Sequence, residues 1–359
     1  MNVIIAGGGT AGHVNPALAL AERFPGDEVG FIGTTRGVEA SLVPSAGHSF
    51  QTIEIEGFDR ARPERLPLVA IRAMGAIIAA RGLLKDRRPD IVVGMGGYVS
   101  LPVCLAAATA RIPVVLHEQN IVLGLAHRTC KPVAKRVAVS FEDTLAQAGS
   151  KGVMTGNPVS KKVAELDVEA ARPVGLQRFD LSGDRRTVLI FGGSLGALTI
   201  NRAAAELATR WAGRDDVQIL HITGRSPSTQ ATAPTGVDPA VYRSLPYTDA
   251  IEEAYAIADV AVCRGGASTI AELTAVGIPA VVVPYPFHRD RQQYRHGEVL
   301  EKVGAGVVVD DRVAGGATVD AALAGFLQPD GLARAKGAAR SLGRRDAAER
   351  LAEVVRAAA

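Results

Sequence analysis

The chain contains the same local pattern twice, once in each half: an apolar run, a glycine-rich turn and an alanine-rich stretch. Near the start, residues 3–6 (VIIA) precede residues 7–12 (GGGTAG), and far downstream residues 188–191 (VLIF) precede residues 192–196 (GGSLG). A short buried strand, a glycine turn and a helix together direct backbone N–H groups and a helix dipole at an anion. Each half is therefore expected to hold a phosphate-binding α/β unit.

A second pattern recurs in the same order. Residues 91–93, 96–97 and 112–115 (IVV, GG, IPVV) are matched by residues 260–262, 265–266 and 278–281 (VAV, GG, IPAV). Apolar runs alternate with helical stretches throughout, which is typical of parallel βαβ winding. The sequence thus predicts an α/β protein of two Rossmann-like, doubly wound domains facing a cleft that takes a nucleotide-sugar type of ligand.

Length and composition fit this organisation. A chain of 359 residues suits two domains, and the net charge of +3 is too small to indicate nucleic-acid binding. Cys104, Cys130 and Cys263 are widely spaced, as expected of buried thiols in a reducing compartment. Met1 leads directly into the first apolar run, and no apolar run is long enough to span a bilayer. We expect a cytoplasmic protein that can still touch a membrane surface.

The boundary is placed after the turn-forming residues 156–159 (GNPV), giving domains 1–160 and 161–343. The last stretch, about residues 344–359, is an alanine-rich helix. It either completes the second domain or packs back on the first.

The first glycine turn also fits the dinucleotide fingerprint Gly7-x-Gly9-x-x-Gly12. That fingerprint requires an acidic residue at the end of the second strand, and residues 30–35 (GFIGTT) contain none, which disfavours NAD and FAD. His13 and Asn15 instead put polar side chains just after the glycines. A histidine there can also be a simple helix cap or a satisfied core residue.

Two glycine turns in the second half each open a predicted helix, and neither is a P-loop because no Gly-Lys-Ser/Thr follows. Glu272 lies within the first two turns of the second of these helices. It either complements the helix dipole at the surface or accepts both hydroxyls of a ribose whose phosphates bind at the helix start.

Polar clusters follow one strand in each half. Residues 117–120 (HEQN) end the run 114–116, and residues 290–294 (DRQQY) follow the run 280–283. His-Glu suggests zinc, but His-Glu-x-x-His is absent because position 121 is Ile, and the chain contains no Asp-x-Asp pair for a divalent cation. No metal or cofactor is expected, and helix termini, backbone N–H groups and Arg264 are left to balance a diphosphate.

Residues 66–88 have helical periodicity, with apolar Leu68, Ile71, Met74, Ile77 and Ile78. Basic residues precede and accompany this stretch, with Asp86 as its one acid: Arg60, Arg62, Arg65, Arg72, Arg81, Lys85, Arg87 and Arg88. The stretch is either a crossover helix with a solvated basic face or a docking surface for anionic lipid headgroups.

Taken together, these motifs resemble the MurG-type enzymes, which add N-acetylglucosamine to the undecaprenyl-linked muramyl peptide and so convert lipid I into lipid II. The matching segments are collinear over nearly the whole chain: 8–13, 94–98, 117–120, 156–159, 192–196, 263–267 and 290–294. The resemblance implies a GT-B glycosyltransferase with an amino-terminal acceptor domain and a carboxyl-terminal UDP-N-acetylglucosamine domain. It implies an inverting, metal-independent reaction at the cytoplasmic membrane face, with the enzyme bound peripherally to an anionic membrane surface and other wall-synthesis proteins as partners.

The resemblance also implies which residues hold UDP-N-acetylglucosamine: Thr10, Ala11, Gly12, Asn120, Ser194, Thr248, Ala267, Ser268, Thr269, Ile270, Ala271, Glu272, Gln292 and Gln293. Tyr98, His117 and Glu118 are expected on the acceptor side. The family commonly has Arg after Gly-Asn-Pro-Val, whereas this chain has Ser160, so either Ser160 or Lys161 in a shifted register takes that contact.

His13 is predicted to be the general base, because histidine is neutral and basic near pH 7 and a helix start disfavours its protonated form. His117 and Glu118 are the rival bases, and a purely donor-binding role for His13 is a third option. At the level of the whole protein, three alternatives stay open: another GT-B glycosyltransferase acting on a lipid or natural product, a non-catalytic nucleotide-sugar-binding protein, and a sugar-nucleotide epimerase.

Overall fold

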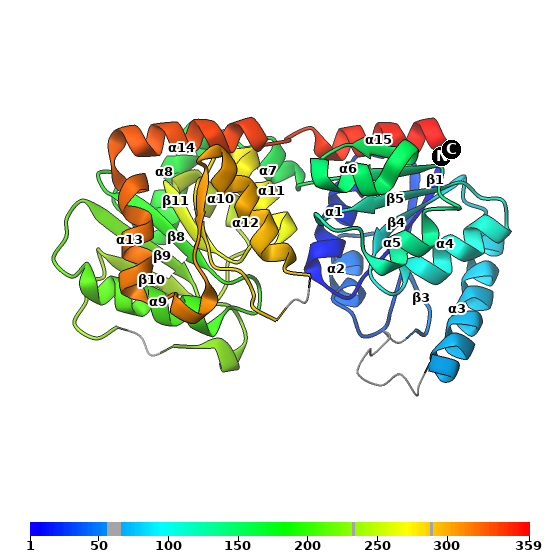
Figure 1. Ribbon diagram of the computed structural model, residues 1–359, viewed down its shortest axis with the longest axis horizontal. Helices are drawn as coiled ribbons and strands as arrows, with labels where there is room; N and C mark the ends of the chain where they lie inside the picture. The colour runs from blue at the N-terminus through cyan, green and yellow to red at the C-terminus, as the bar shows by residue number, and fades with distance from the viewer. Residues whose placement is uncertain (56–65, 232–233, 288–289) are drawn as a thin grey trace. The chain divides into compact units, whose positions relative to one another are not determined.

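The computed structural model describes residues 1–55, 66–231, 234–287 and 290–359, with only the backbone of residues 66–71 (Figure 1). Arg60, Arg62 and Arg65 lie outside the described residues. The chain forms two compact units, Met1–Lys161 with Arg345–Ala359, and Lys162–Arg344. Each unit is built around one parallel sheet.

The first unit has a seven-stranded sheet in the order β3-β2-β1-β4-β5-β6-β7, every neighbouring pair of which is parallel. Its strands are β1 (Asn2–Gly7), β2 (Glu28–Gly33), β3 (Ser49–Thr52), β4 (Ile91–Gly96), β5 (Val114–Glu118), β6 (Arg136–Val139) and β7 (Gly152–Met154). Its helices are α1 (Ala11–Ala21), α2 (Glu39–Ser45), α3 (Leu66–Arg87), α4 (Ser100–Thr109), α5 (Leu125–Cys130), α6 (Glu142–Ala148) and α15 (Ala347–Ala358).

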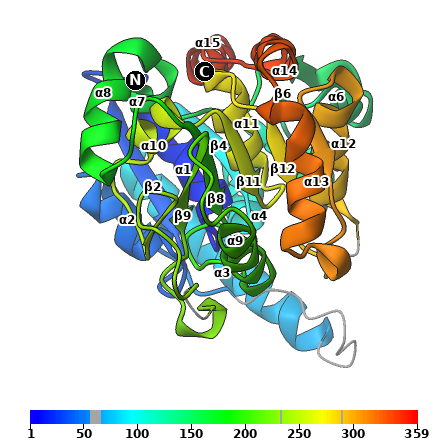
Figure 2. The same ribbon diagram turned by 90° about the vertical axis from the view of Figure 1, so that its left-hand side faces the viewer.

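The second unit has a six-stranded parallel sheet in the order β10-β9-β8-β11-β12-β13 (Figure 2). Its strands are β8 (Arg186–Phe191), β9 (Val217–Ile222), β10 (Tyr242–Leu245), β11 (Val260–Cys263), β12 (Ala280–Val282) and β13 (Gly306–Val308). Its helices are α8 (Val168–Phe179), α9 (Leu198–Arg210), α10 (Ile251–Ile257), α11 (Ala267–Val276), α12 (Gln292–Val303), α13 (Gly316–Leu327) and α14 (Pro329–Leu342), and short α7 (Lys161–Ala164) begins at the junction.

Both sheets confirm the predicted doubly wound α/β class, and the physical reason is visible in the strand sequences. Strands β4 and β11 read IVVGMG and VAVC and are buried along their whole length, as strands covered by helices on both faces must be. Strand β3 was not predicted. Its sequence SFQT is mostly polar and it is only partly buried at the sheet edge, so no apolar run marks it.

The carboxyl-terminal helix α15 packs on the first unit. Leu351, Ala352 and Val355 are fully buried in one core cluster with Ile5 and Leu20. The Lys135 ammonium donates to the Ala358 carbonyl over 2.7 Å, which fixes the end of the helix. The chain therefore returns to the first sheet after completing the second.

Candidate functional site

The first glycine turn follows β1 and is hydrogen-bonded to a buried carboxylate, that of Glu39. Glu39 is 1% exposed, and its Oε2 accepts a 2.8 Å hydrogen bond from the Gly9 N–H. Its Oε1 accepts from the N–H of Thr34 at 3.0 Å and from the Thr34 hydroxyl at 2.7 Å. Burial opposes the charged form, but these donors outweigh it and hold the pKa of Glu39 below its ordinary value. A Cβ on Gly8 would lie 2.2 Å from this carboxylate, which is why glycine is required there.

Helix α1 begins directly after this turn and presents His13 in its first turn. Thr10 and Gly12 are exposed, Ala11 and His13 are half-buried, and the Thr10 hydroxyl lies 3.1 Å from His13 Nδ1. Burial lowers the pKa of His13 and outweighs the raising effect of Glu118, and the neighbouring His127 lowers it further. The structure therefore places His13 as a neutral imidazole at the carboxyl edge of the sheet.

The next turn along this edge joins β4 to α4 and contains Gly96 and Gly97. Both have positive φ, +98° and +78°, a region that disfavours residues with a Cβ. A Cβ on Gly96 would also lie 2.8 Å from His13 Cδ2, so glycine leaves room for the imidazole. Tyr98 follows at 61% exposed, available to a ligand.

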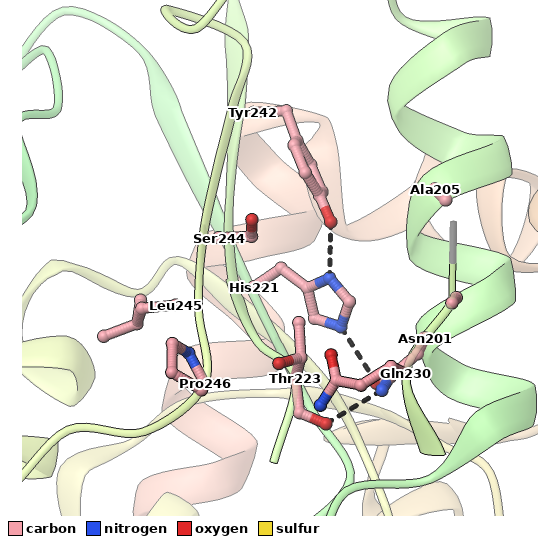
Figure 3. A pocket seen from close by; sticks show the side chains of 10 residues that line it. Asn201, Ala205, His221, Thr223, Gln230, Tyr242, Ser244, Leu245 and Pro246 are labelled. Atoms are coloured by element: carbon pink, nitrogen blue, oxygen red, sulfur yellow. Dashed lines mark hydrogen bonds between the residues drawn. The ribbon is translucent and has the colours of Figure 1, made fainter. Parts of the chain in front are cut away.

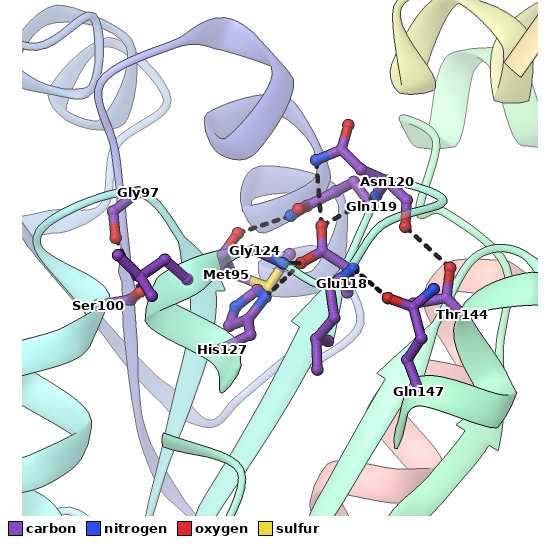
Figure 4. Close-up of polar contacts among 12 residues, drawn as sticks. Met95, Gly97, Ser100, Glu118, Gln119, Asn120, Gly124, His127, Thr144 and Gln147 are labelled. Atoms are coloured by element: carbon purple, nitrogen blue, oxygen red, sulfur yellow. Dashed lines mark hydrogen bonds and ion pairs between the residues drawn. The ribbon is translucent and has the colours of Figure 1, made fainter. Parts of the chain in front are cut away.

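Strand β5 ends in a buried polar network centred on Glu118 (Figure 4). Its Oε1 accepts from the backbone and the side-chain N–H of Asn120, both at 3.0 Å. Its Oε2 accepts from the Gly124 N–H at 2.8 Å and lies 2.7 Å from His127 Nδ1. Burial opposes the charge, but His127 and these donors lower the pKa of Glu118 to about 2. Glu118 thus orders the loop that carries Asn120 from inside the protein.

The other two residues of the cluster are also buried. His117 donates from Nε2 to the Gly156 carbonyl at 3.1 Å, and burial lowers its pKa to about 4, so it is neutral. Gln119 donates to the Met95 carbonyl at 2.7 Å. Of the four predicted polar residues, only Asn120 is half-buried rather than buried.

In the second unit the turn between β8 and α9 carries Ser194, which is exposed. Gly193 and Gly196 adopt φ of +94° and +84°, and a Cβ on Gly196 would lie 2.1 Å from the Thr223 carbonyl. The Ser194 carbonyl accepts from the Arg225 N–H at 3.0 Å, which ties this turn to the loop after β9. The turn is open and has no side-chain cap on the helix that follows.

Helix α11 begins after Gly266, also without a side-chain cap. The Ser268 hydroxyl is buried and has no hydrogen-bond partner among the described residues. Four neighbouring positions are half-buried and Ile270 is buried: Ala267, Ser268, Thr269, Ile270 and Ala271. An uncapped helix start with an unpartnered hydroxyl is suited to an anionic ligand.

Glu272, one turn further along α11, accepts a 2.7 Å hydrogen bond from the Tyr255 hydroxyl on α10. Burial raises the pKa of Glu272 to about 7, although the bond from Tyr255 opposes the shift. Tyr255 is 2% exposed, so it fixes the carboxylate from the interior.

Three of the remaining predicted donor residues, Thr248, Gln292 and Gln293, follow strands of the second sheet, and Ser160 belongs to the first unit. Gln293 Oε1 accepts from the Tyr285 N–H at 2.9 Å, and Gln292 donates to Asp290 at 2.5 Å. Thr248 is half-buried after β10, and its hydroxyl accepts from the Ala250 N–H at 3.0 Å. Ser160 is half-buried at the end of the first unit.

Arg264 and Lys161 have partners that sequence reasoning did not anticipate. Arg264 donates to Asp311 and to the Val283 carbonyl at 3.0 Å. This ties β11 to the segment after β13. The Lys161 N–H donates to Glu22 at 3.0 Å.

Two cavities lie near these segments. In the first unit, a groove of about 690 Å³ runs between α3 and the ends of β2 and β3 and is lined by Thr34, Arg36, Thr52, Glu54, Arg72 and Ala76. In the second unit, a smaller cavity of about 250 Å³ lies between α9 and the ends of β9 and β10 (Figure 3). There His221 bridges the Tyr242 hydroxyl at 2.7 Å and Asn201 Oδ1 at 3.0 Å.

Within the described residues, no cluster of three or more His, Cys, Asp or Glu side chains is arranged to hold a metal ion. Glu39, His127 and Tyr255, which the structure places under the predicted residues, were not predicted. Each makes its key contact with a different element of the fold (Gly9, Glu118 and Glu272, respectively), so no local sequence pattern marks it, and a buried glutamate near a helix start looks in sequence like a surface one.

Sequence models of the glycosyltransferase family 28 N-terminal and C-terminal domains match residues 3–139 and 187–351. The chain belongs to glycosyltransferase family 28. The two family 28 domains fall on the first and the second sheet, respectively.

Relatives and a solved structure agree with this family 28 assignment. A protein of Halothermothrix orenii is 39% identical over 323 residues, covering 87% of this chain and 86% of its own length. One of Clavibacter sepedonicus is 40% identical over 365 residues, covering 98% and 95%. Both are named UDP-N-acetylglucosamine–N-acetylmuramyl-(pentapeptide) pyrophosphoryl-undecaprenol N-acetylglucosamine transferase. The crystal structure of Acinetobacter baumannii MurG is 25% identical and superposes with a TM-score of 0.77 over 99% of both chains. The MurG-type resemblance and the GT-B fold are confirmed.

Proposed function

We propose that this chain transfers N-acetylglucosamine from UDP-N-acetylglucosamine to an undecaprenyl-pyrophosphoryl N-acetylmuramyl-pentapeptide, the step from lipid I to lipid II in peptidoglycan synthesis. The observation that carries the proposal is that relatives sharing up to 40% identity over nearly the whole chain have this activity in their names. The reaction needs a donor site and an acceptor site, and each unit supplies side chains suited to one of them.

The second unit is proposed to bind the donor. The Ser194 turn and the start of α11 offer N–H groups and the unpartnered Ser268 hydroxyl to the diphosphate. Glu272, fixed by Tyr255, accepts the ribose hydroxyls. Two neighbouring amides, Gln292 and Gln293, suit sugar hydroxyls, which both donate and accept. Asn120, Thr10, Ala11 and Gly12 of the first unit stay predicted contacts of the donor.

The first unit is proposed to bind the acceptor, with His13 as general base. The acceptor hydroxyl attacks the anomeric carbon of N-acetylglucosamine, its proton passes to His13, and the bond to the diphosphate breaks to release UDP with inversion. A neutral imidazole is required for this step, and burial lowers the pKa of His13 as the step demands. His117 and Glu118 are buried with internal partners, so a supporting role suits them better than direct proton transfer.

The groove beside α3 is proposed to hold anionic groups of the acceptor. Arg36 and Arg72 line it together with threonine hydroxyls and one carboxylate, that of Glu54. Thr34 also contacts Glu39, the carboxylate under the turn that precedes His13. The groove therefore lies between α3 and the loop after β2, whose Thr34 is hydrogen-bonded to the carboxylate under the first glycine turn.

Helix α3 is proposed to dock the enzyme on an anionic membrane surface from the cytoplasm. No helix in the described part of the chain meets the length and hydropathy needed to cross a bilayer. On α3, Met74 and Ile78 are 59% and 66% exposed, one turn apart, while Ala76 and Ala80 face the core. Arg72, Arg81 and Lys85 are exposed along the same helix. Exposed apolar side chains amid basic ones suit an interfacial helix.

Reversing the charge of Arg81, Lys85 and Arg88, which are exposed and do not line the groove, tests this docking role. Each basic residue near an anionic surface contributes about 1 kcal/mol, and a reversed charge is also repelled, so the triple variant should bind phosphatidylglycerol vesicles more than about 100-fold more weakly. Turnover of a soluble acceptor should survive. Unchanged vesicle binding in a sedimentation assay would instead make α3 a plain crossover helix.

The transfer itself is tested by measuring UDP release from UDP-N-acetylglucosamine with and without a lipid I analogue. We expect release only with the acceptor, and a disaccharide product by mass spectrometry. Donor turnover without acceptor would indicate an epimerase, and tight donor binding without any turnover would indicate a binding protein.

A further inference from the structure

We propose that the buried His127–Glu118 pair is a positioning element of the transfer reaction: a protonated His127 holds the carboxylate that orders the Asn120 loop and places a positive charge beside His13. The inference rests on the proposed function. It goes beyond it because neither the sequence motifs nor the comparisons point to His127.

The geometry is that of a buried hydrogen-bonded pair, which becomes an ion pair when His127 is protonated. Both side chains are 3% exposed, and His127 Nδ1 lies 2.7 Å from Glu118 Oε2. An ionised carboxylate can only accept, so Nδ1 carries the hydrogen. The same carboxylate accepts from the Asn120 and Gly124 N–H groups, and Gly124 is the residue before helix α5, which carries His127. Strand, loop and helix are therefore joined at one carboxylate.

His127 also reaches the surroundings of His13. The point where a Cβ on Gly96 would stand is 3.0 Å from His13 Nε2 and 3.4 Å from His127 Cε1. The two imidazole rings thus line the same side of one glycine. His127 Nε2 is buried and makes no well-formed hydrogen bond to the described residues, although the Gly94 carbonyl lies near enough to favour the charged ring.

The groups around His127 agree on its charge. Burial opposes protonation, but Glu118 on β5 outweighs it and raises the pKa of His127, with Cys130 on its own helix adding to the effect. His117 on β5 is neutral. For His13 on α1, Glu118 and Glu39 raise the pKa, whereas His127 lowers it. Removing the charge of His127 should therefore make His13 easier to protonate.

Two substitutions separate the hydrogen bond from the charge. In His127→Asn the amide nitrogen is bonded to Cγ, as Nδ1 is in histidine, so it can still donate to Glu118, but the positive charge is gone. In His127→Leu both are lost and the buried carboxylate loses one partner. His48→Asn is the matched control, since His48 packs on Phe31 at 5.2 Å and precedes β3, at the opposite end of the sheet.

The first readout is an NMR titration of labelled histidines, which needs no substrate. We expect His127 to be protonated at pH 7 in the unaltered protein, and the pKa of His13 to rise by about one unit in His127→Asn. His48→Asn should leave the His13 titration unchanged. A neutral His127 at pH 7, or an unshifted His13 in His127→Asn, would overturn the proposal.

The second readout is the pH profile of kcat/KM for transfer. In His127→Asn the acid limb should move to higher pH by the same amount, with UDP affinity within about twofold. In His127→Leu, kcat/KM should fall more than tenfold across the range. An unmoved acid limb in His127→Asn contradicts the proposal. If the unaltered protein transfers no sugar, the proposed function fails, and the NMR titration alone still decides the pair.

Discussion

The two glycine turns that begin each half look alike in sequence, yet the structure gives them opposite electrostatic surroundings. Under the first, the buried Glu39 carboxylate accepts the Gly9 N–H and occupies the space below Gly8. At the second, no carboxylate of the described residues is hydrogen-bonded to the turn around Ser194, while the helices that follow the two turns both lack a side-chain cap. One turn is closed by the protein's own anion and the other is open to an external one.

This difference indicates how one motif serves two tasks. The Glu39 carboxylate accepts from the Gly9 N–H and repels an anion, so the first turn is suited to hold Thr10 and His13 in place. The second turn keeps its N–H groups available for a diphosphate. The first turn is therefore expected to matter for catalysis and stability, and the second unit for nucleotide affinity.

The largest effect is expected from His13→Ala. A positioned base contributes about 10²–10⁴ in rate, so kcat should fall by that factor while the dissociation constant of UDP-N-acetylglucosamine changes little. Steady-state kinetics and calorimetry measure the two quantities. If donor affinity collapses and kcat holds within a few-fold, His13 binds the donor and the two turns do not differ as proposed.

Glu39→Gln should mainly destabilise the first unit. Hydrogen bonds to a charged acceptor contribute about 1.5–3 kcal/mol each, and the amide retains only part of them, so a loss of about 2–4 kcal/mol is expected. Because the folded-state pKa of Glu39 is lowered, its contribution is present above its ordinary pKa and disappears as the pH falls through the lowered value. The melting temperatures of the unaltered protein and of Glu39→Gln should therefore converge as the pH is lowered from 7 to 3. Equal stability at pH 7 would show that Glu39 does not support the turn.

Glu272→Ala should weaken UDP binding by well over tenfold. Two hydrogen bonds from the ribose to a charged acceptor are lost, each worth roughly 1.5–3 kcal/mol. Titration calorimetry with UDP measures the change, and Glu301→Ala on α12 is a control outside the proposed site. Unchanged UDP affinity would remove Glu272 from the donor site.

The same residue predicts a pH dependence. Burial raises the pKa of Glu272 to about 7, and ribose hydroxyls favour the ionised form, so UDP affinity should fall as the pH drops below about 7, by at most tenfold per unit. UDP itself titrates in this range, so the test is the difference between the unaltered protein and Glu272→Gln. Parallel pH profiles for the two would contradict the raised pKa.

The smallest effect is expected from a chelator. If the open turn and the start of α11 hold the diphosphate, transfer in EDTA should equal transfer in buffer. Complete loss in EDTA that Mg²⁺ or Mn²⁺ restores would show that a cation, rather than the turn, neutralises the leaving group.

The strand pattern was predictable because buried parallel strands are continuous apolar runs. Such runs mark the central strands, whereas the edge strands β3 (SFQT) and β10 (YRSL) are only partly buried and lack a continuous apolar run. The glycine turns were predictable for a related reason: positive φ at Gly96 and Gly196, and close approach of neighbouring backbone, allow few other residues. The motifs also determined the family by their order along the chain.

Only the tertiary structure decided which side chains support the predicted ones. Glu39 is hydrogen-bonded to Gly9, 30 residues away in the sequence. Tyr255 on α10 is hydrogen-bonded to Glu272 on α11, and His127 on α5 to Glu118 on β5. The spacing of these pairs in the sequence is not that of a helix or a strand, because each pair joins two elements that the fold brings together at one edge of a sheet. Burial, which sets the charge of these groups, is likewise a property of the packed units. The sequence by itself determined the sheets, the turns and the family, while the packing decided which turn is closed by a carboxylate and which remains open.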